Sequence, residues 1–123
     1  MPLEHEDLTE KIIGAAIQVH RTLGPGFIES IYENALVIEL QKRGLRAEQQ
    51  LEAPITYDGE GVGKHRLDLL VEGTIVVENK AIKDIEDIHF AVARSYLKAV
   101  GLKHGLILNF ARPKLQVKRV IRE

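Results

Sequence analysis

Hydrophobic residues recur along most of the chain with one of two periods, either three to four residues or two residues. The longer period covers residues 8–22, 28–43 and 85–100. This spacing predicts three amphipathic helices. Gly44 and Gly101 directly follow the second and third stretches, as is typical of helix C-terminal ends. Because Gly24-Pro25-Gly26 ends the first stretch, we expect the first two helices to be antiparallel and joined by a short turn.

The remaining hydrophobic segments predict strands. Alternation or short β-branched runs cover residues 45–57, 65–71, 74–79, 106–110 and 115–121. Pro54 cannot donate a ladder hydrogen bond, so the first strand is expected to be bent or at a sheet edge. Three glycines within residues 58–63 predict a flexible loop after it. The order ααβββαββ indicates an α/β protein with a mixed β-sheet flanked by helices.

Length and composition limit the classes of protein to which the chain could belong. With 123 residues, the chain is expected to form a single domain over residues 1–123. Cysteine is absent, which excludes disulfide scaffolds, thiolate zinc sites and cysteine nucleophiles. Apolar runs fall short of the roughly 20 residues of a membrane span, and the acidic first ten residues do not resemble a signal peptide. We therefore expect a cytoplasmic protein with no membrane partner.

Charge is balanced overall and uneven locally. The 17 Lys and Arg and 18 Asp and Glu give a formal net charge of -1, which does not indicate a nucleic-acid-binding protein. Residues 98–123 nevertheless carry seven Lys and Arg against one acidic residue. That end could contact a polyanion, or its charges could protect a solvated sheet edge. Motifs for a serine nucleophile or a phosphate-binding loop are missing, and the lack of tryptophan does not favour a glycosidase.

Candidate chemistry lies on the two strands that flank Gly73. Asp68 belongs to the first of these strands, and Glu78 and Lys80 lie at the end of the second. An unpaired carboxylate beside β-branched residues would lose several kcal/mol of hydration, so Glu78 is expected to have a partner. Glu78 and Lys80 are two residues apart, which places both side chains on the same face of a strand.

The length of the connecting loop decides whether Asp68 joins them. A two-residue turn would place Glu78 on the opposite face from Asp68. A three-residue loop, Glu72-Gly73-Thr74, would pair Val71 with Ile75 and place Asp68 directly opposite Glu78. We expect the three-residue loop, with Gly73 supplying a positive φ.

Two carboxylates that face each other repel unless a proton or a cation lies between them. Their hard oxygen ligands favour Mg²⁺ or Mn²⁺ over Zn²⁺. Lys80 could then orient or help to deprotonate an attacking water and stabilise charge on a phosphate, as phosphodiester hydrolysis requires. A salt bridge from Lys80 to Asp68 or Glu78 on a solvated sheet face explains the same spacing equally well.

A longer motif covers the start of the second predicted helix, where the chain reads Gly26-Phe27-Ile28-Glu29-Ser30-Ile31-Tyr32. With the acid-x-lysine triplet that ends at Lys80, the chain resembles the PD-(D/E)XK nuclease superfamily and, within it, the GxxExxY proteins. The resemblance implies a restriction-endonuclease-like core. It also implies catalytic roles for Asp68, Glu78 and Lys80, with Asp68 and Glu78 as the metal ligands, and an additional acidic residue at Glu29.

Further candidates surround this set. Glu29 and Tyr32 lie three residues apart on one helical face, although a buried tyrosine is more often a core residue. His20 could reach the same cleft or could bond a helix end. The resemblance extends to Tyr96, an accessory candidate. Substrate phosphates would be bound by basic residues such as Arg66 and Lys98.

Two residues depart from the pattern of the superfamily. Asn79 stands where the triplet usually carries an apolar residue, so the face opposite the site is expected to be less buried or to meet a partner. Val92 stands where related sequences often carry glutamine. The expected function is a Mg²⁺- or Mn²⁺-dependent nuclease acting on DNA or RNA. The alternative is a non-catalytic binding or regulatory module with a nuclease fold, acting as a homodimer or with a protein partner.

Overall fold

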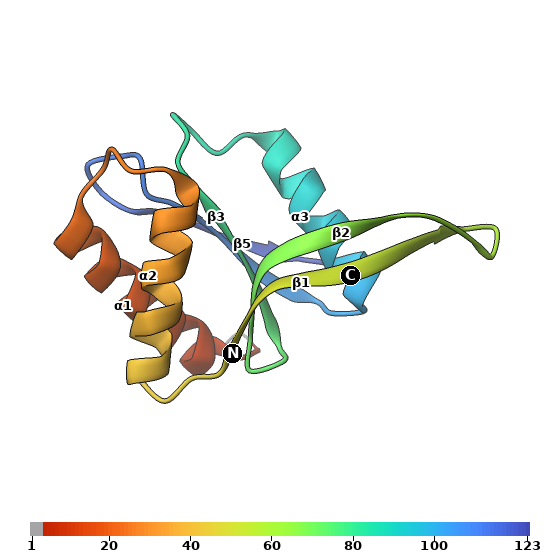
Figure 1. Ribbon diagram of the computed structural model, residues 1–123, viewed down its shortest axis with the longest axis horizontal. Helices are drawn as coiled ribbons and strands as arrows, with labels where there is room; N and C mark the ends of the chain where they lie inside the picture. The colour runs from red at the N-terminus through yellow and green to blue at the C-terminus, as the bar shows by residue number, and fades with distance from the viewer. Residues whose placement is uncertain (1–3) are drawn as a thin grey trace.

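A computed structural model describes residues 4–123, and residues 1–3 of the predicted domain lie outside it. Its elements are α1 (Glu6–Leu23), α2 (Glu29–Lys42), β1 (Ala47–Tyr57), β2 (Glu60–Val71), β3 (Ile75–Lys80), α3 (Asp87–Val100), β4 (His104–Asn109) and β5 (Gln116–Ile121). This is the predicted order ααβββαββ (Figure 1). Within residues 4–123, no helix combines the length and apolarity needed to cross a bilayer.

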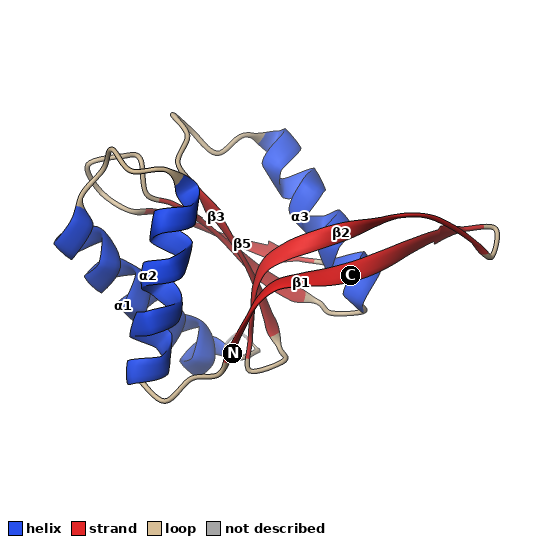
Figure 2. Cartoon of the chain, viewed as in Figure 1, coloured by secondary structure: helices blue, strands red, loops and turns tan. Residues whose placement is uncertain are grey.

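The five strands form one mixed sheet in the order β1-β2-β3-β4-β5. Strands β3 and β4 are parallel, whereas the other neighbouring pairs are antiparallel. A parallel pair needs a long crossover, and α3 supplies it. Helices α1 and α2 cover one face of the sheet and α3 covers the other (Figure 2). The predicted fold class, an α/β protein with a flanked mixed sheet, is therefore confirmed.

Strand β3 lies at the centre of both layers of the core. Ile75 and Val77 pack in the cluster that contains α1 and α2, and Val76 packs in the cluster that contains α3. Because both faces are covered, the strand is apolar on both sides rather than alternating. The end of β3 that carries Glu78 and Lys80 therefore follows directly on a buried segment of the strand.

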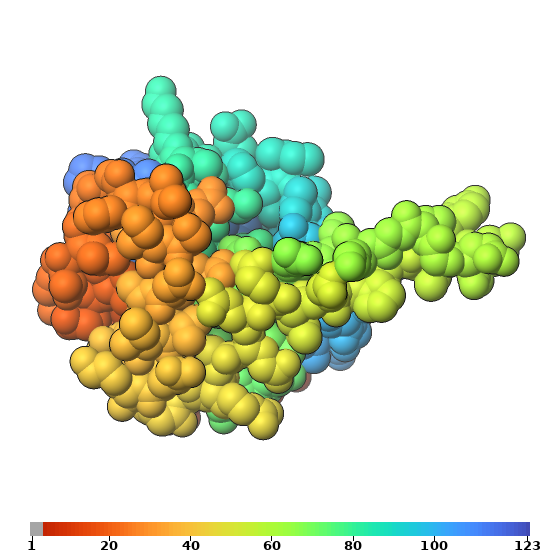
Figure 3. All heavy atoms as spheres, in the orientation of Figure 1, coloured from red at the N-terminus to blue at the C-terminus, as the bar shows by residue number. Residues whose placement is uncertain are grey.

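Strands β1 and β2 form a long hairpin whose tip projects beyond the rest of the molecule (Figures 1 and 3). Strand β1 is an edge strand, as Pro54 predicted. The predicted loop over residues 58–63 is wrong, because β2 already begins at Glu60. Asp58 and Gly59, with φ of 52° and 79°, supply the two positive-φ positions of a tight two-residue turn. Pairing therefore restarts at once, with Tyr57 opposite Glu60.

Candidate active site

The hairpin between β2 and β3 has the predicted register. Val71 pairs with Ile75 across a three-residue loop, and Gly73 has a φ of 61°. Ladder pairing continues only to Leu69 and Val77. One further step in this register brings Asp68 level with Glu78, at the point where the two strands separate. The predicted three-residue loop, with Val71 opposite Ile75, is confirmed.

Beyond Val77, the side chain of Asp68 takes the place of a backbone hydrogen-bond partner on β2. Its Oδ2 accepts the backbone N–H of Asn79 at 2.8 Å. This bond satisfies a buried donor that would otherwise be unpaired, and it fixes the carboxylate beside the end of β3. Glu78 and Lys80 alternate with Val76 along β3, so they share the face that α3 covers.

Burial sets the electrostatics of the two acids. It raises the pKa of Asp68 to about 6, while the Asn79 N–H and the Lys80 charge act in the opposite direction. Burial, and then the neighbouring charge of Asp68, raise the pKa of Glu78 to about 9. Glu78 is only 4% exposed, and its Oε1 has no hydrogen-bond partner among residues 4–123. Both carboxylates are thus more stable with a proton or a cation nearby than as bare anions.

Lys80 contributes positive charge to this pair without forming a salt bridge to it. Its charge lowers the pKa of both Asp68 and Glu78. In the described part of the chain, however, the ion pairs within 4.0 Å do not include Lys80. The salt bridge from Lys80 to Asp68 or Glu78 that the sequence allowed is therefore not formed. The half-buried Lys80 keeps its charge available for a substrate or a water.

The expectation for Asn79 is wrong. Its side chain is fully buried, because α1 and α2 cover the face of β3 opposite Glu78. Neither Oδ1 nor Nδ2 of Asn79 has a partner among residues 4–123. Asn109, at the end of β4, is equally buried but well bonded: it accepts from the Ile82 N–H at 3.0 Å and donates to the Ile82 carbonyl at 2.8 Å. Asn109 thereby holds the loop that follows Lys80.

A second helical acid, Glu33, was missed by the sequence analysis. Glu29 lies in the exposed first turn of α2, whereas Glu33 is 6% exposed and accepts hydrogen bonds from Gln49 at 2.6 Å and Gln50 at 2.9 Å. The charges of both acids raise the pKa of Asp68, and that of Glu33 has the larger effect. The spacing of four residues, which puts both acids on one helical face, was the available signal.

Helix α3 brings Tyr96 to the two strand acids. Burial raises the pKa of Tyr96, and the charges of Glu78 and Asp68 raise it further. The ring packs edge-on against His65 of β2, with the centroids 4.3 Å apart. Tyr96 is thus the accessory candidate that the fold places within electrostatic reach of the acids.

Tyr32 and His20, the other two accessory candidates, contact neighbouring segments of the chain. The Tyr32 hydroxyl donates to the Gly24 carbonyl at 2.6 Å, and its ring stacks on Phe110 at a centroid distance of 4.6 Å. His20 Nε2 lies 2.8 Å from the Arg112 carbonyl oxygen. These contacts tie the α1–α2 connection and the β4–β5 loop to the core.

The two predicted substrate-binding residues lie on the surface. Arg66 is paired with Glu52 at 3.5 Å, and the same carboxylate also pairs with Lys64. Lys98 lines a cavity of about 360 Å³ between β1 and α3, together with His65. Arg66 and Lys98 thus flank the base of the projecting hairpin.

The donor set at the strand ends suits a hard cation. Asp68 and Glu78 offer carboxylate oxygens, and one of the Glu78 oxygens is buried and free of hydrogen bonds within the described structure. Oxygen ligands of this kind bind Mg²⁺ and Mn²⁺ in preference to softer metals. The residues present therefore fit a hard divalent cation such as Mg²⁺ or Mn²⁺.

The comparisons with known proteins agree with this architecture. The crystal structure of SSO0001 matches with a TM-score of 0.61 and 17% identity, over 96% of this chain. The chain spans 59% of the length of that protein. No match was found among curated proteins. The sequence model described as the PD-(D/E)XK nuclease superfamily matches residues 6–120. The restriction-endonuclease-like core is thereby confirmed, and the chain belongs to the PD-(D/E)XK nuclease superfamily.

Proposed function

We propose that this protein is a metal-dependent nuclease that hydrolyses phosphodiester bonds of DNA or RNA, with Mg²⁺ or Mn²⁺ as its cofactor. The observation that carries the proposal is the pair of buried acids, Asp68 and Glu78, with Lys80 beside them on the same strand face. Burying two neighbouring carboxylates is unfavourable by itself, so the arrangement is best explained by a cation. Superfamily membership supports the same activity.

Each group has a distinct task in this proposal. Asp68 and Glu78 hold the cation, which when bound polarises the scissile phosphate and lowers the pKa of a water. Lys80 orients that water and offsets charge on the phosphate, because its ammonium is not engaged in an ion pair within residues 4–123. Glu29, the helical acid that the resemblance implies, and Glu33 both add negative charge from α2. Tyr96 would line the α3 side of the site, where the charges of both acids act on it.

The finer assignments rest on the same site. We assign the chain to the GxxExxY branch because its helix motif is complete from Gly26 to Tyr32, and we treat residues 1–123 as one nuclease-like domain. Arg66 and Lys98 would contact substrate phosphates on either side of the hairpin base. A homodimer or protein partner remains a prediction.

The test is cleavage of labelled single- and double-stranded DNA and RNA by tag-free protein in Mg²⁺, in Mn²⁺ or in EDTA. We expect metal-dependent cleavage that Lys80→Met reduces by about 100-fold or more. Lys83→Met, which removes an exposed lysine three residues away, is the matched control and should cleave normally.

Binding of the cation is measured separately by calorimetry. Asp68→Asn should weaken Mg²⁺ binding, whereas Lys80→Met should preserve it. Cleavage that persists in EDTA or in folded Lys80→Met protein would contradict the proposed mechanism. Metal binding without cleavage of any of the four substrates would instead support the non-catalytic module.

A further inference from the structure

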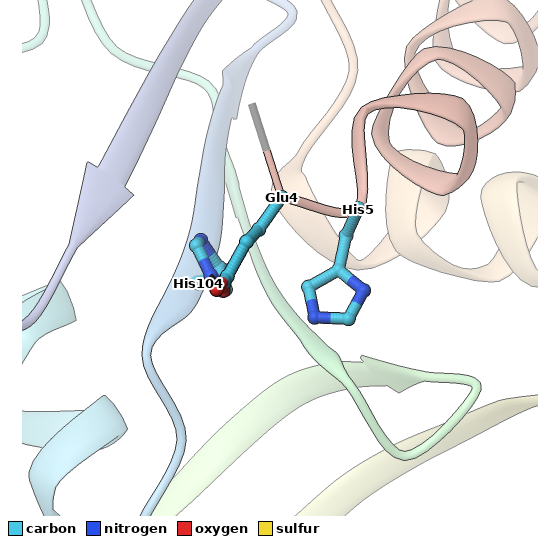
Figure 4. Close-up of side chains that lie close together, drawn as sticks. All are labelled: Glu4, His5 and His104. Carbon is cyan, nitrogen blue, oxygen red and sulfur yellow. Dashed lines mark hydrogen bonds and ion pairs between the residues drawn. The ribbon is translucent and has the colours of Figure 1, made fainter. Parts of the chain in front are cut away.

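A cluster of metal-binding side chains lies at the opposite end of the β3–β4 pair from the acids. His104, the first residue of β4, pairs with Ile75, whereas Lys80 pairs with Asn109 at the other end. Glu4 and His5, which directly precede α1, meet His104 there (Figure 4). The ligand atoms of Glu4, His5 and His104 all lie within 4.8 Å of one another.

The contacts within the cluster hold the three side chains close to one another but do not use all of their nitrogen and oxygen atoms. Glu4 Oε2 lies 2.8 Å from His104 Nε2, and the rings of His5 and His104 pack edge to face with centroids 5.2 Å apart. His5 stands at the start of α1, yet its side chain makes no capping hydrogen bond. Its backbone adopts a left-handed conformation, with φ 56° and ψ 27°, which is uncommon for a residue other than glycine. The backbone thus brings the imidazole to His104 rather than to the helix.

We propose that Glu4, His5 and His104 form a second metal site, selective for Zn²⁺ or a similar transition metal. Two imidazoles and one carboxylate are a donor set that suits such metals, and three protein ligands leave a coordination position open. A cavity of about 130 Å³ adjoins Glu4 and His104 and provides room for a water or another small ligand at that position.

Neighbouring charges explain the selectivity. Arg119 lines the same cavity. The pKa of Glu4 is lowered chiefly by the hydrogen bond to His104, and the charge of Lys103 adds a small effect in the same direction. One carboxylate beside two cations attracts a hard dication only weakly. Binding there depends on coordinate bonds from imidazole nitrogen, which Zn²⁺ forms and Mg²⁺ does not favour. The site would therefore differ in metal preference from the all-oxygen pair at Asp68 and Glu78.

A metal at this position would join the segment before α1 to the sheet. Glu4 and His104 are 100 residues apart in sequence, so they meet as ligands only in the folded protein. A metal that binds the folded state alone stabilises it by the free energy of binding. A metal at this site would therefore stabilise the fold, and this effect does not depend on the nuclease activity proposed above.

The test uses tag-free protein and Zn²⁺ alone, both in the wild type and in an Asp68→Asn/Glu78→Gln background that removes the acidic pair. Calorimetry of the double variant should give one equivalent of Zn²⁺. Excess Zn²⁺ should raise the melting temperature of the double variant by about 5 °C or more, and Mg²⁺ should not. His5→Gln or His104→Gln should weaken Zn²⁺ binding about tenfold or more. His89→Gln, which removes a histidine from α3, is the matched control.

A spectroscopic measurement separates coordination from a general effect on stability. Co²⁺ substituted for Zn²⁺ should give intense visible bands in the double variant, and both histidine variants should lose them. If His104→Gln does not fold, His5→Gln and Glu4→Gln at exposed positions carry the test. Failure of the double variant to bind Zn²⁺, or binding unchanged in the histidine variants, would overturn the proposal. Neither result would bear on cleavage at Asp68 and Glu78.

Discussion

The carboxylate of Asp68 accepts the backbone N–H of Asn79 at 2.8 Å, at the place where β2 and β3 cease to pair. A side chain thus takes over a hydrogen bond that the sheet ladder would otherwise make. The bond leaves the second oxygen of Asp68 available and holds it beside Glu78. Because β2 and β3 separate here, the side chains of Asp68 and Glu78 can come together at the end of the hairpin.

The raised pKa values of Asp68 and Glu78 predict the pH dependence of stability in the metal-free protein. A carboxyl whose pKa is higher in the folded state than its usual value of 3.8 or 4.5 loses its proton more easily when unfolded. Its stabilising contribution is therefore complete below about pH 4 and is lost as the pH rises toward about 9, the folded pKa of Glu78.

Glu78→Gln removes most of this dependence. In EDTA at pH 8, the variant should be more stable than the wild type by about 2 kcal/mol, and the two proteins should converge near pH 4. Urea unfolding at a series of pH values measures the difference. Added Mg²⁺ should narrow it at pH 8 by stabilising only the wild type. Parallel pH profiles in the two proteins would show that Glu78 is not perturbed.

The unpaired amide of Asn79 predicts a stabilising substitution. Asn79→Leu replaces a buried side chain that has no described partner by an apolar one of similar size, so we expect a gain of about 1–2 kcal/mol. Asn109→Leu is the contrasting variant, because it leaves the N–H and carbonyl of Ile82 unpaired; it should lose about 2 kcal/mol. Chemical denaturation gives both values. A loss of stability in Asn79→Leu would mean that the amide is satisfied in solution.

The two helical acids should differ in their effect on the cation. Glu33→Gln keeps an acceptor for Gln49 but removes a charge that raises the pKa of both strand acids, so both pKa values should fall. The lost charge should also weaken Mg²⁺ binding by about tenfold. Glu29→Gln, the exposed counterpart, should change it less. Calorimetry gives the affinities and carboxyl NMR titration the pKa values; equal effects of the two variants would reject the assignment of Glu33.

Tyr32 is expected to act through stability. Tyr32→Phe keeps the stack on Phe110 but leaves the Gly24 carbonyl without its 2.6 Å hydrogen bond, which should destabilise the fold by about 1–2 kcal/mol. Tyr57→Phe removes a hydroxyl from a side chain that is 76% exposed, so it should be nearly neutral. Thermal unfolding compares the two. Loss of cleavage without loss of stability in Tyr32→Phe would instead place this hydroxyl in the chemistry.

The features that sequence reasoning predicted well are those governed by local rules. Side-chain parity on adjacent strands is a fixed period of two, so the chain itself determined that Asp68 and Glu78 meet once the loop at Gly73 has three residues. The turn at Asp58-Gly59 obeys a local rule as well. The glycines of residues 58–63 were interpreted as a flexible loop, although an Asp-Gly pair between two alternating segments is typical of a two-residue hairpin turn.

The features that it missed depend on how elements pack against each other. Asn79 was expected to be less buried because it is polar, whereas the helices on that face bury whatever residue the strand presents. Glu29 and Glu33 share one face of α2, and periodicity cannot say which turn lies nearer to the sheet. The glutamines that hold Glu33 come from β1, at a position where Gln50 adopts a φ of 56°. Nothing in the local sequence indicates that conformation.

The outer part of the β1–β2 hairpin leaves the body of the protein and is supported there by its own ladder (Figure 3). Such a ribbon can be trimmed in matched steps, for instance Tyr57 together with Glu60, and every remaining side chain keeps its neighbour across the ladder. Removing a residue from one strand alone would shift the register of the strand pairing at the tip by one residue. The length of the β1–β2 hairpin can therefore change without disturbing the acids at the end of β3.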